Sequence, residues 1–483
     1  MGFTAVQRVV GFLIAGSSLM MLPPVLVSLW YGDGTTELFL TSAAILLALG
    51  LAIYVPVRHV KEELRLRDGF LIVVSAWLAL ALVGAVPFLL LTSPELSYVD
   101  AVFESMSGLT TTGATIVTNI DALPRAILYY RQQLQWLGGM GIIVLAVAIL
   151  PMLRIGGMQL YRAETPGPMK DAKLTPRITE TAKALWLIYV GITVTCAMAY
   201  WLAGMKLFDA VGHAFSTVAI GGFSTHDDSL AFWSNPTVEA VAIFFMAVAG
   251  INFALHFTAW RRASTQPYFL DPELRVYASL LLAFSVVVSF GLYLTGTYET
   301  LATSFRYGTF QVISAMTTTG FTTAPFYTWG GALPVILMLL AFIGGCAGST
   351  AGGMKVIRVI LLYRQSVREI LRLVHPHAVY PVKIGGQRTS DTVISAVWGF
   401  FFLYIANFAV MTIMLTATGL DAETAYSAVG ACITNLGPAL GLAGPNYAAL
   451  NDTAKVVLSL AMLLGRLEIY TLLVLLTPAF WRG

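Results

Sequence analysis

The fold is decided by the stretch Ser107-Gly108-Leu109-Thr110-Thr111-Thr112-Gly113-Ala114-Thr115, a threonine- and glycine-rich run that follows an apolar segment too short to cross a membrane. Three other stretches repeat its pattern, in which a short apolar segment runs up to a polar turn that ends in glycine. Counted back thirteen residues from that glycine, the four copies are DAVFESMSGLTTTG (100–113), DAVGHAFSTVAIGG (209–222), YGTFQVISAMTTTG (307–320) and TAYSAVGACITNLG (424–437). The anchoring glycines lie 109, 98 and 117 residues apart, so the repeating unit is a whole module and the chain contains four of them.

The composition is that of a membrane protein. Hydrophobic residues make up 57% of the 483 residues and charged residues only 11%, against about 25% charged in ordinary soluble domains. The mean hydropathy is +0.78. Apolar runs of about 20 residues recur along the chain, which is the length that spans a bilayer core of about 30 Å. We therefore expect an all-α polytopic membrane protein.

Each module is predicted to be a spanning helix, a re-entrant half-helix with its polar turn, and a second spanning helix. Two further spanning helices, about 5–30 and 38–57, precede the modules. The predicted spanning pairs are about 70–91 with 134–152, 183–204 with 237–259, 275–296 with 334–362, and 392–417 with 453–479. The corresponding divisions of the chain are 1–68 for the leading helices, then 69–178, 179–270, 271–390 and 391–483 for the four repeats. This gives ten spanning helices and four half-helices, with the four parallel repeats placed around one pore.

Lys and Arg are distributed unevenly over this topology. Of the 28 basic residues, 22 fall on one side, four fall on the other (Arg125, Arg131, Lys206 and Arg306), and two lie in the last helix. Because cytoplasmic loops carry the excess of Lys and Arg, the first side is predicted to be cytoplasmic. Both termini are then cytoplasmic, and all four glycine turns enter the membrane from outside.

The sequence contains no pattern typical of an enzyme. Cys196, Cys346 and Cys432 have neither CxxC spacing nor a Cys/His arrangement, so they indicate packing rather than a disulfide framework or a metal site. There is no recognisable nucleotide-binding fold and no catalytic constellation. We expect no enzymatic activity, no covalently bound cofactor and no nucleic-acid partner.

The four turns have the chemistry of a cation filter. Non-helical backbone at membrane depth is tolerated where it is buried in protein or lines a water-filled path, and a ring of carbonyl oxygens can replace the hydration shell of a potassium ion. Glycine can adopt positive φ without a Cβ clash, and each half-helix directs its partly negative C-terminal end toward the pore. A single TTTG is common loop composition, so the prediction of cation selectivity depends on the fourfold repetition.

The motifs SGLTTTGAT, IGGFSTHD, TTTGFTT and TNLGP resemble those of the Trk/Ktr/HKT superfamily of potassium transporters. The likeness covers nearly the whole chain, and the length and the two leading helices make it most similar to the Trk-type membrane subunit. In this superfamily, potassium is held by backbone carbonyls just before and at the signature glycine. By position, the resemblance implies a potassium-binding filter of Thr111, Thr112, Gly113, Ile220, Gly221, Gly222, Thr318, Thr319, Gly320, Asn435, Leu436 and Gly437.

A second glycine-rich stretch, Ile343-Gly-Gly-Cys-Ala-Gly-Ser-Thr-Ala-Gly-Gly-Met-Lys355, lies within the predicted helix 334–362. Glycine costs roughly 1 kcal/mol against alanine in a helix interior, so we expect a loop inside the membrane. A phosphate-binding loop would need the order GxxxxGK[ST], which is absent, and close helix packing by small residues is the other alternative. The resemblance implies a gate beneath the filter that is formed by Gly344, Gly345, Gly348, Ser349, Thr350, Gly352, Gly353 and Lys355, together with Arg466.

Arg466 is predicted near the centre of the final apolar helix, where arginine costs about 2.5–3.5 kcal/mol on insertion scales. Glu468 is two residues away and faces another side of a helix, so it is a poor in-helix partner. An interhelical salt bridge is one interpretation, and a fixed positive charge in the conduction path, near the carbonyls of the glycine loop, is the other. Glu104 either attracts cations near the first half-helix or is a solvated or capped carboxylate, and His213 is predicted to be packed and hydrogen-bonded.

The resemblance implies potassium uptake across the bacterial inner membrane through a channel-like pore. It also implies a homodimer that works with a cytosolic, nucleotide-binding regulatory ring, TrkA, so nucleotide would act only through that partner. The basic loops 154–177 and 355–391 are candidates for docking it. The alternative function is a symporter that couples potassium to protons or sodium. An ATP-driven pump is disfavoured because no nucleotide motif is present.

Overall fold

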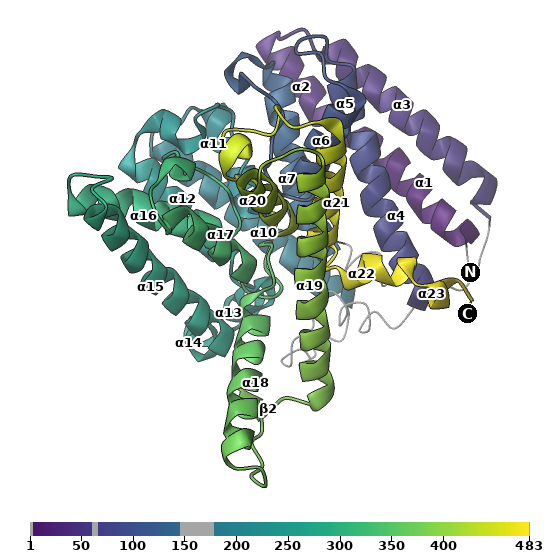
Figure 1. Ribbon diagram of the computed structural model, residues 1–483. Coiled ribbons are helices and arrows are strands. Elements are labelled where there is room, and N and C mark those ends of the chain that lie inside the picture. The colour runs from purple at the N-terminus through teal and green to yellow at the C-terminus, as the bar shows by residue number, and fades with distance from the viewer. Residues whose placement is uncertain (1–2, 60–65, 145–177, 483) are drawn as a thin grey trace.

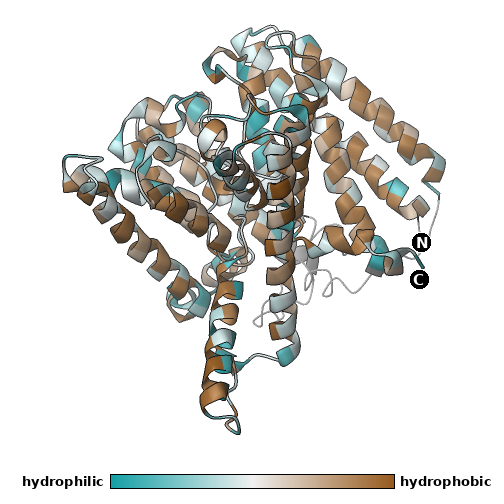
Figure 2. Ribbon diagram, in the orientation of Figure 1, coloured by the Kyte–Doolittle hydropathy of each residue, from teal (hydrophilic) through white to brown (hydrophobic). Residues whose placement is uncertain are grey.

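The computed structural model describes residues 3–59, 66–144 and 178–482. These residues form helices almost throughout (Figure 1). The hydrophobic residues lie mainly along the helices that cross the middle of the molecule, and the polar residues gather toward its two ends (Figure 2). Within the described residues, six helical segments are long and apolar enough to span a membrane, and the number is eight if each of two bent helix pairs is one span. An all-α polytopic membrane protein is confirmed.

The leading helices are α1 (Phe3–Ser17), α2 (Leu22–Tyr31) and α3 (Thr36–Tyr54). A short 3-10 segment separates α1 from α2, whose first turn contains the two prolines. Small residues let α1 and α3 approach closely, since a Cβ placed on Gly50 would lie 2.2 Å from the backbone nitrogen of Ala15. Backbone contact through small residues is a common way for membrane helices to pack.

The four repeats follow in chain order. Repeat one contains α4 (Leu66–Gly84), α5 (Val86–Leu89), α6 (Tyr98–Leu109) and α7 (Arg125–Val144). Repeat two contains α10 (Ile178–Leu202), α11 (Leu207–Ala219), α12 (Pro236–Ala249), α13 (Phe253–Arg262) and α14 (Gln266–Leu270). Repeat three contains α15 (Pro272–Leu294), α16 (Leu301–Met316), α17 (Leu333–Ile343) and α18 (Val356–Val374). Repeat four contains α19 (Asp391–Ala417), α20 (Ala422–Ile433), α21 (Asp452–Arg466), α22 (Tyr470–Leu473) and α23 (Pro478–Arg482).

The remaining elements are short. The strands β1 (Lys383–Ile384) and β2 (Gln387–Arg388) form an antiparallel hairpin between α18 and α19. The 3-10 segments are Ser18–Met21, Val55–Val57, Ile120–Ala122, Ser229–Trp233, Phe326–Thr328, Gly441–Ala443 and Val474–Leu476. In Figure 1, α18 and α19 project together below the rest of the molecule, with the hairpin near their lower ends.

The second helix of repeat one differs from the predicted 134–152. It begins at Arg125, where the backbone amide of Ala126 donates a 2.8 Å hydrogen bond to Asp33 from the leading helices. Its first eleven residues contain two arginines and three glutamines, so the start of the helix lies in a polar stretch that hydropathy does not assign to a span. Residues 145–152 of the predicted helix and the loop 154–177 lie outside the described residues.

The predicted unbroken helix 237–259 is wrong. α12 ends at Ala249, and α13 leaves at 91° after a short break. Asn252 caps α13, because its side chain accepts a hydrogen bond from the amide of Ala254. The break pairs with the glycine-rich loop: Cys346 N donates to Gly250 O at 2.9 Å, and Phe253 N donates to Gly348 O at 3.0 Å. The two helices together are apolar enough to pass for one span, so hydropathy did not indicate the break.

The predicted unbroken helix 453–479 is also wrong. α21 ends at Arg466, and the chain turns by 108° into α22. Glu468 and Ile469 have positive φ, 54° and 57°, which a right-handed α-helix does not include. Arg466 therefore lies at the end of a helix rather than at the centre of one. Glu468 pairs with Arg358 of α18 across the fold.

The predicted break in helix 334–362 is confirmed. α17 ends at Ile343 and α18 begins at Val356, with the glycine-rich loop between them. α17 has only 11 residues, which is too short to span a membrane on its own. We call residues 344–355 the glycine loop below.

Candidate functional site

The four half-helices α6, α11, α16 and α20 form a matched set. In three of them a residue just before the helix caps it: the side chains of Ser97, Thr300 and Asp421 each accept a hydrogen bond from the backbone amide three residues later. α11 has no such cap, but it carries Asp209 in its first turn. A capped N-terminus fixes where each helix begins, and so fixes where its C-terminal turn is placed.

The turns that follow these helices share one backbone conformation. The residue before each signature glycine donates its amide to the carbonyl five residues earlier. These bonds are Thr112 N to Ser107 O (2.9 Å), Gly221 N to Ser216 O, Thr319 N to Ser314 O and Leu436 N to Ala431 O (2.8 Å each). One residue earlier the backbone is left-handed, with φ of 53° at Thr111, 56° at Ile220, 62° at Thr318 and 57° at Asn435. Non-glycine residues adopt this conformation at a cost of roughly 1–2 kcal/mol, so its occurrence in all four turns indicates that the surrounding structure enforces it.

The four signature glycines close a ring. A Cβ placed on each glycine would collide with the carbonyl oxygen that precedes the glycine of the next repeat. The distances from this added Cβ are 2.1 Å at Gly113 to Gly221 O, 2.1 Å at Gly222 to Thr319 O, 2.1 Å at Gly320 to Leu436 O and 2.4 Å at Gly437 to Thr112 O. The contacts run from repeat one through repeat four and back to one. All twelve residues of the predicted filter thus lie in one ring, which we call the glycine ring.

The glycine ring concentrates oxygen atoms between four helix C-termini. Backbone carbonyls in such a ring can replace the hydration shell of a cation, and the partly negative helix ends favour positive charge. Threonines and asparagine of the turns are buried, with exposure of 1% or less at Thr111, Thr318 and Asn435. A cation is therefore the ligand that this chemistry fits.

A cavity of about 530 Å³ opens on one side of the glycine ring. It is lined by all four signature glycines and by the segments that follow them, including Ser224, Thr322 and Tyr447. We call this cavity the vestibule.

Two side chains that the sequence did not single out hold carbonyls of the ring. Gln135 of α7 donates its Nε2 to Gly221 O at 2.6 Å and accepts from Phe223 N at 3.0 Å. The hydroxyl of Tyr447 donates to Gly437 O at 2.7 Å. The polar run at residues 131–135 inside an apolar region was the available signal for Gln135, whereas nothing in the sequence marked Tyr447.

The glycine loop lies against the ring on the side away from the vestibule. Gly352 N donates to Thr318 Oγ1 at 2.7 Å, and Gly353 N donates to Thr434 O at 3.0 Å. Thr350 Oγ1 donates to Val218 O at 3.0 Å. Each of these acceptors precedes the signature glycine of its repeat, while the vestibule is lined by residues at and after the glycines. The loop therefore contacts the opposite side of the ring at repeats two, three and four.

Arg466 holds the glycine loop from the end of α21. Its guanidinium donates to Thr350 O and to Gly138 O of α7, at 3.0 Å each, and the residue is buried. Lys355, at the end of the loop, donates its ammonium to Ala351 O. The gate residues predicted from the sequence, Gly344, Gly345, Gly348, Ser349, Thr350, Gly352, Gly353 and Lys355, thus form one loop that contacts Arg466.

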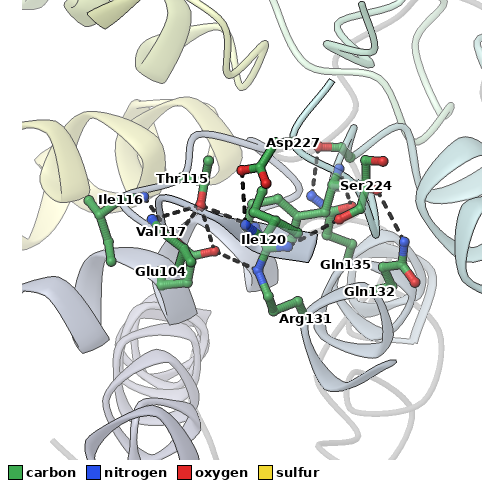
Figure 3. A network of polar contacts seen from close by, with 12 residues as sticks. Glu104, Thr115, Ile116, Val117, Ile120, Arg131, Gln132, Gln135, Ser224 and Asp227 are labelled. Atoms are coloured by element: carbon green, nitrogen blue, oxygen red, sulfur yellow. Dashed lines mark hydrogen bonds and ion pairs between the residues drawn. The ribbon is translucent and has the colours of Figure 1, made fainter. Parts of the chain in front are cut away.

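Glu104 and Arg131 differ from the expectations for them. Glu104 is fully buried and pairs with Arg131 of α7 at 2.8 Å, so the carboxylate is not solvated (Figure 3). Arg131, which the topology placed in a loop outside, is equally buried within a helix. His213 is packed and hydrogen-bonded as predicted, with its ring nitrogens at 2.8 Å from Asp209 O and 2.9 Å from Ser224 Oγ.

Comparison with known proteins identifies the family of the chain. The TrkH family, described as "Cation transport protein", matches residues 36–482. The chain is 55% identical to the Trk system potassium uptake protein TrkH of Halomonas elongata and 50% identical to that of Escherichia coli K12, in each case over 100% of both chains. The crystal structure of the potassium transporter TrkH from Vibrio parahaemolyticus superposes with a TM-score of 0.92 at 49% identity, and it also covers 100% of both chains. The chain is therefore a multi-pass membrane protein that belongs to the TrkH family of cation transport proteins.

Proposed function

We propose that this protein takes up potassium through a channel-like pore whose selectivity filter is the glycine ring. The observation that carries the proposal is the closed set of four contacts between each signature glycine and the carbonyl of the next repeat. A closed ring of four equivalent turns surrounds a single ion path. Potassium is the proposed ion because the full-length relatives are named potassium uptake proteins.

In this proposal, the filter residues act through their backbone. The carbonyls of the twelve ring residues replace water around the ion, and those of Gly221 and Gly437 are held in position by Gln135 and Tyr447. A carbonyl has two lone pairs, so one that accepts a protein hydrogen bond still has an electron pair to offer a cation. The membrane potential supplies about 2.3 kcal/mol per 100 mV for each inward charge.

The glycine loop is the proposed gate. It is hydrogen-bonded to three of the four repeats directly below the ring, and Arg466 adds a positive charge at that point. A fixed positive charge there lowers cation occupancy, and the loop occupies the path itself. Ions pass when the loop moves away from Thr318 and Thr434.

The setting of the pore rests on resemblance and on charge distribution. We place the chain in the bacterial inner membrane with both termini cytoplasmic, because the basic residues gather on one side. We further propose a homodimer that is regulated by a cytosolic nucleotide-binding ring of the TrkA type, as in the resembling superfamily. Nucleotide would act through that ring.

Reconstitution tests the function. The purified chain is placed in liposomes, and fluxes of potassium, rubidium and sodium are measured under an imposed voltage without ATP or a second ion gradient; protein-free liposomes are the control. Flux that follows the voltage and favours potassium is the expected result. Flux that appears only with a proton or sodium gradient would overturn the channel mechanism in favour of a symporter.

A further inference from the structure

In each half-helix, one side chain forms a hydrogen bond with the segment that follows the helix's own turn. We call this contact a brace. The residue nine positions before the signature glycine makes this contact in repeats one to three, where it is Glu104, His213 or Gln311. The braces are Glu104 to Ile116 N (3.0 Å), His213 Nε2 to Ser224 Oγ (2.9 Å) and Gln311 Nε2 to Ala324 O (3.3 Å). In repeat four that position is Ala428, and the preceding Ser427 accepts from Leu440 N at 3.0 Å instead. All four braces reach residues two to four positions past the glycine.

Repeat one differs from the other repeats because its brace is a charged side chain. Its brace is a carboxylate, and both oxygens of Glu104 lie 3.0 Å from Thr115 Oγ1. A buried, unpaired carboxylate would be costly, and the pairing cation is Arg131, whose Nε is 2.8 Å from Glu104 Oε1. Both side chains are fully buried.

Arg131 also joins repeat one to repeat two. Its Nη1 donates to Ser224 O at 3.2 Å, its Nη2 donates to Thr115 Oγ1 at 3.1 Å, and the guanidinium lies 4.2 Å from the centre of the Phe223 ring. Figure 3 shows the side chain between the segment that follows Gly113 and the segment that follows Gly222. The planar guanidinium thus fixes the distance between two adjacent turns, which a lysine ammonium, a single point of charge, would not do.

We propose that Glu104 and Arg131 are positioning residues that set ion discrimination by holding the exits of the first and second turns in register. The inference rests on the proposed function, since it assigns these residues to the filter. The contacts of the pair fix the geometry beside the vestibule. Because the two charges cancel, the pair adds no net positive charge to the ion path. Removing one partner disturbs both the spacing and this neutrality.

The test uses the full-length protein in liposomes and compares three variants. Arg131→Lys keeps the charge but loses the planar guanidinium that contacts both turns. Glu104→Gln leaves Arg131 without its carboxylate partner. The double variant Glu104→Gln/Arg131→Met removes both charges. The matched control is Glu239→Gln, which breaks the pair between Arg306 and Glu239, two contacts of 2.7 Å that lie away from the ring. The readouts are the potassium-to-sodium permeability ratio and the potassium flux at low external potassium.

We expect the permeability ratio to fall about ten-fold in Arg131→Lys, since charge-assisted hydrogen bonds that define the spacing are lost. In Glu104→Gln we expect potassium flux to fall most at low potassium, where an uncompensated positive charge matters most. The double variant should recover flux but not selectivity, and Glu239→Gln should retain the ratio of the unchanged protein.

A ratio that is unchanged in Arg131→Lys and in the double variant would overturn the inference. If either single variant fails to fold, the double variant decides alone, because it contains no unpaired buried charge. The unchanged protein separates this failure from a failure of the proposed function: if it shows no selective, voltage-driven flux, the filter assignment itself is wrong.

Discussion

The glycine ring and the glycine loop are both rich in glycine, but glycine serves them differently. In the ring there is one signature glycine per repeat, and each makes room for the carbonyl of the next repeat, so every contact depends on the other three. In the loop the glycines are clustered in one segment, which is held to its surroundings by separate hydrogen bonds such as those of Thr350 and Gly352. A closed set of contacts resists change as a unit, whereas separate bonds can be released one after another. The comparison suggests that the ring determines selectivity and the loop determines flux.

Arg466→Ala tests this division with the largest effect. It removes a buried charge and two hydrogen bonds to carbonyls, each worth roughly 1.5–3 kcal/mol when the donor is charged. We expect potassium flux without a partner to rise about ten-fold or more, with the potassium-to-sodium ratio unchanged. Arg125→Ala, which removes a charge at the start of α7, is the control. Unchanged flux in folded Arg466→Ala would remove the residue from the gate, and loss of folded protein would support a purely structural role.

Gly352→Ala has the next largest effect. A Cβ at this position would lie 2.0 Å from Thr434 O, so the loop must move away from the fourth turn. Overpacking of this kind costs about 1–3 kcal/mol. We expect higher flux in the liposome assay with the selectivity of the unchanged protein, whereas Gly16→Ala, where nothing lies within 4 Å, should have no effect. A collapse of selectivity would show that the ring and the loop do not act separately.

Thr350→Val removes one hydroxyl of the loop and nearly preserves its shape. The main interaction lost is the 3.0 Å hydrogen bond from Thr350 Oγ1 to Val218 O, and the same hydroxyl also lies 3.4 Å from Ala249 O. Since such a bond contributes about 1 kcal/mol, flux should rise about five-fold or less, with selectivity unchanged. A flux equal to that of the unchanged protein would mean that this bond does not hold the loop in place.

The smallest effect concerns pH at the vestibule. Burial disfavours protonation of His226, but Asp209 and Asp121 outweigh it and raise the pKa of the imidazole above its ordinary value of 6.5. The protonated residue therefore stabilises the folded state fully below about pH 6.5, and this contribution is lost as the pH rises through the raised pKa. We expect about 1 kcal/mol or less. Thermal unfolding of the unchanged protein and His226→Gln between about pH 5 and about pH 9 should differ in slope, and parallel curves would contradict the assignment.

The sequence predicted the turns and the loop better than the helices around them. Repetition located Thr111, Ile220, Thr318 and Asn435 at equivalent positions, and the glycine density of residues 344–355 predicted a break. The sequence did not predict the breaks after Ala249 and Arg466. The first break is held by contacts with the glycine loop and the second by a contact with α18, and hydropathy contains no information on tertiary contacts.

Side chains that brace the ring were equally hard to predict. Gln135 and Tyr447 reach carbonyls 86 and 10 residues away in the chain. Arg131 was placed outside because the predicted span began only at residue 134, and its partner Glu104 lies 27 residues away in a half-helix. The contact of Gln135 crosses from repeat one to repeat two, so it depends on how the repeats assemble. The other two contacts join separate segments of one repeat, at spacings that match no helix or strand period.

If four equivalent turns form one closed ring, a serine at any signature glycine should disturb the whole ring. Potassium-to-sodium permeability ratios would be measured for Gly113→Ser, Gly222→Ser, Gly320→Ser and Gly437→Ser, with Gly330→Ser, where nothing lies within 4 Å, as the control. The account predicts a fall of about ten-fold or more in all four variants and none in the control. A folded variant of any one of the four that keeps the original ratio would contradict the closed ring.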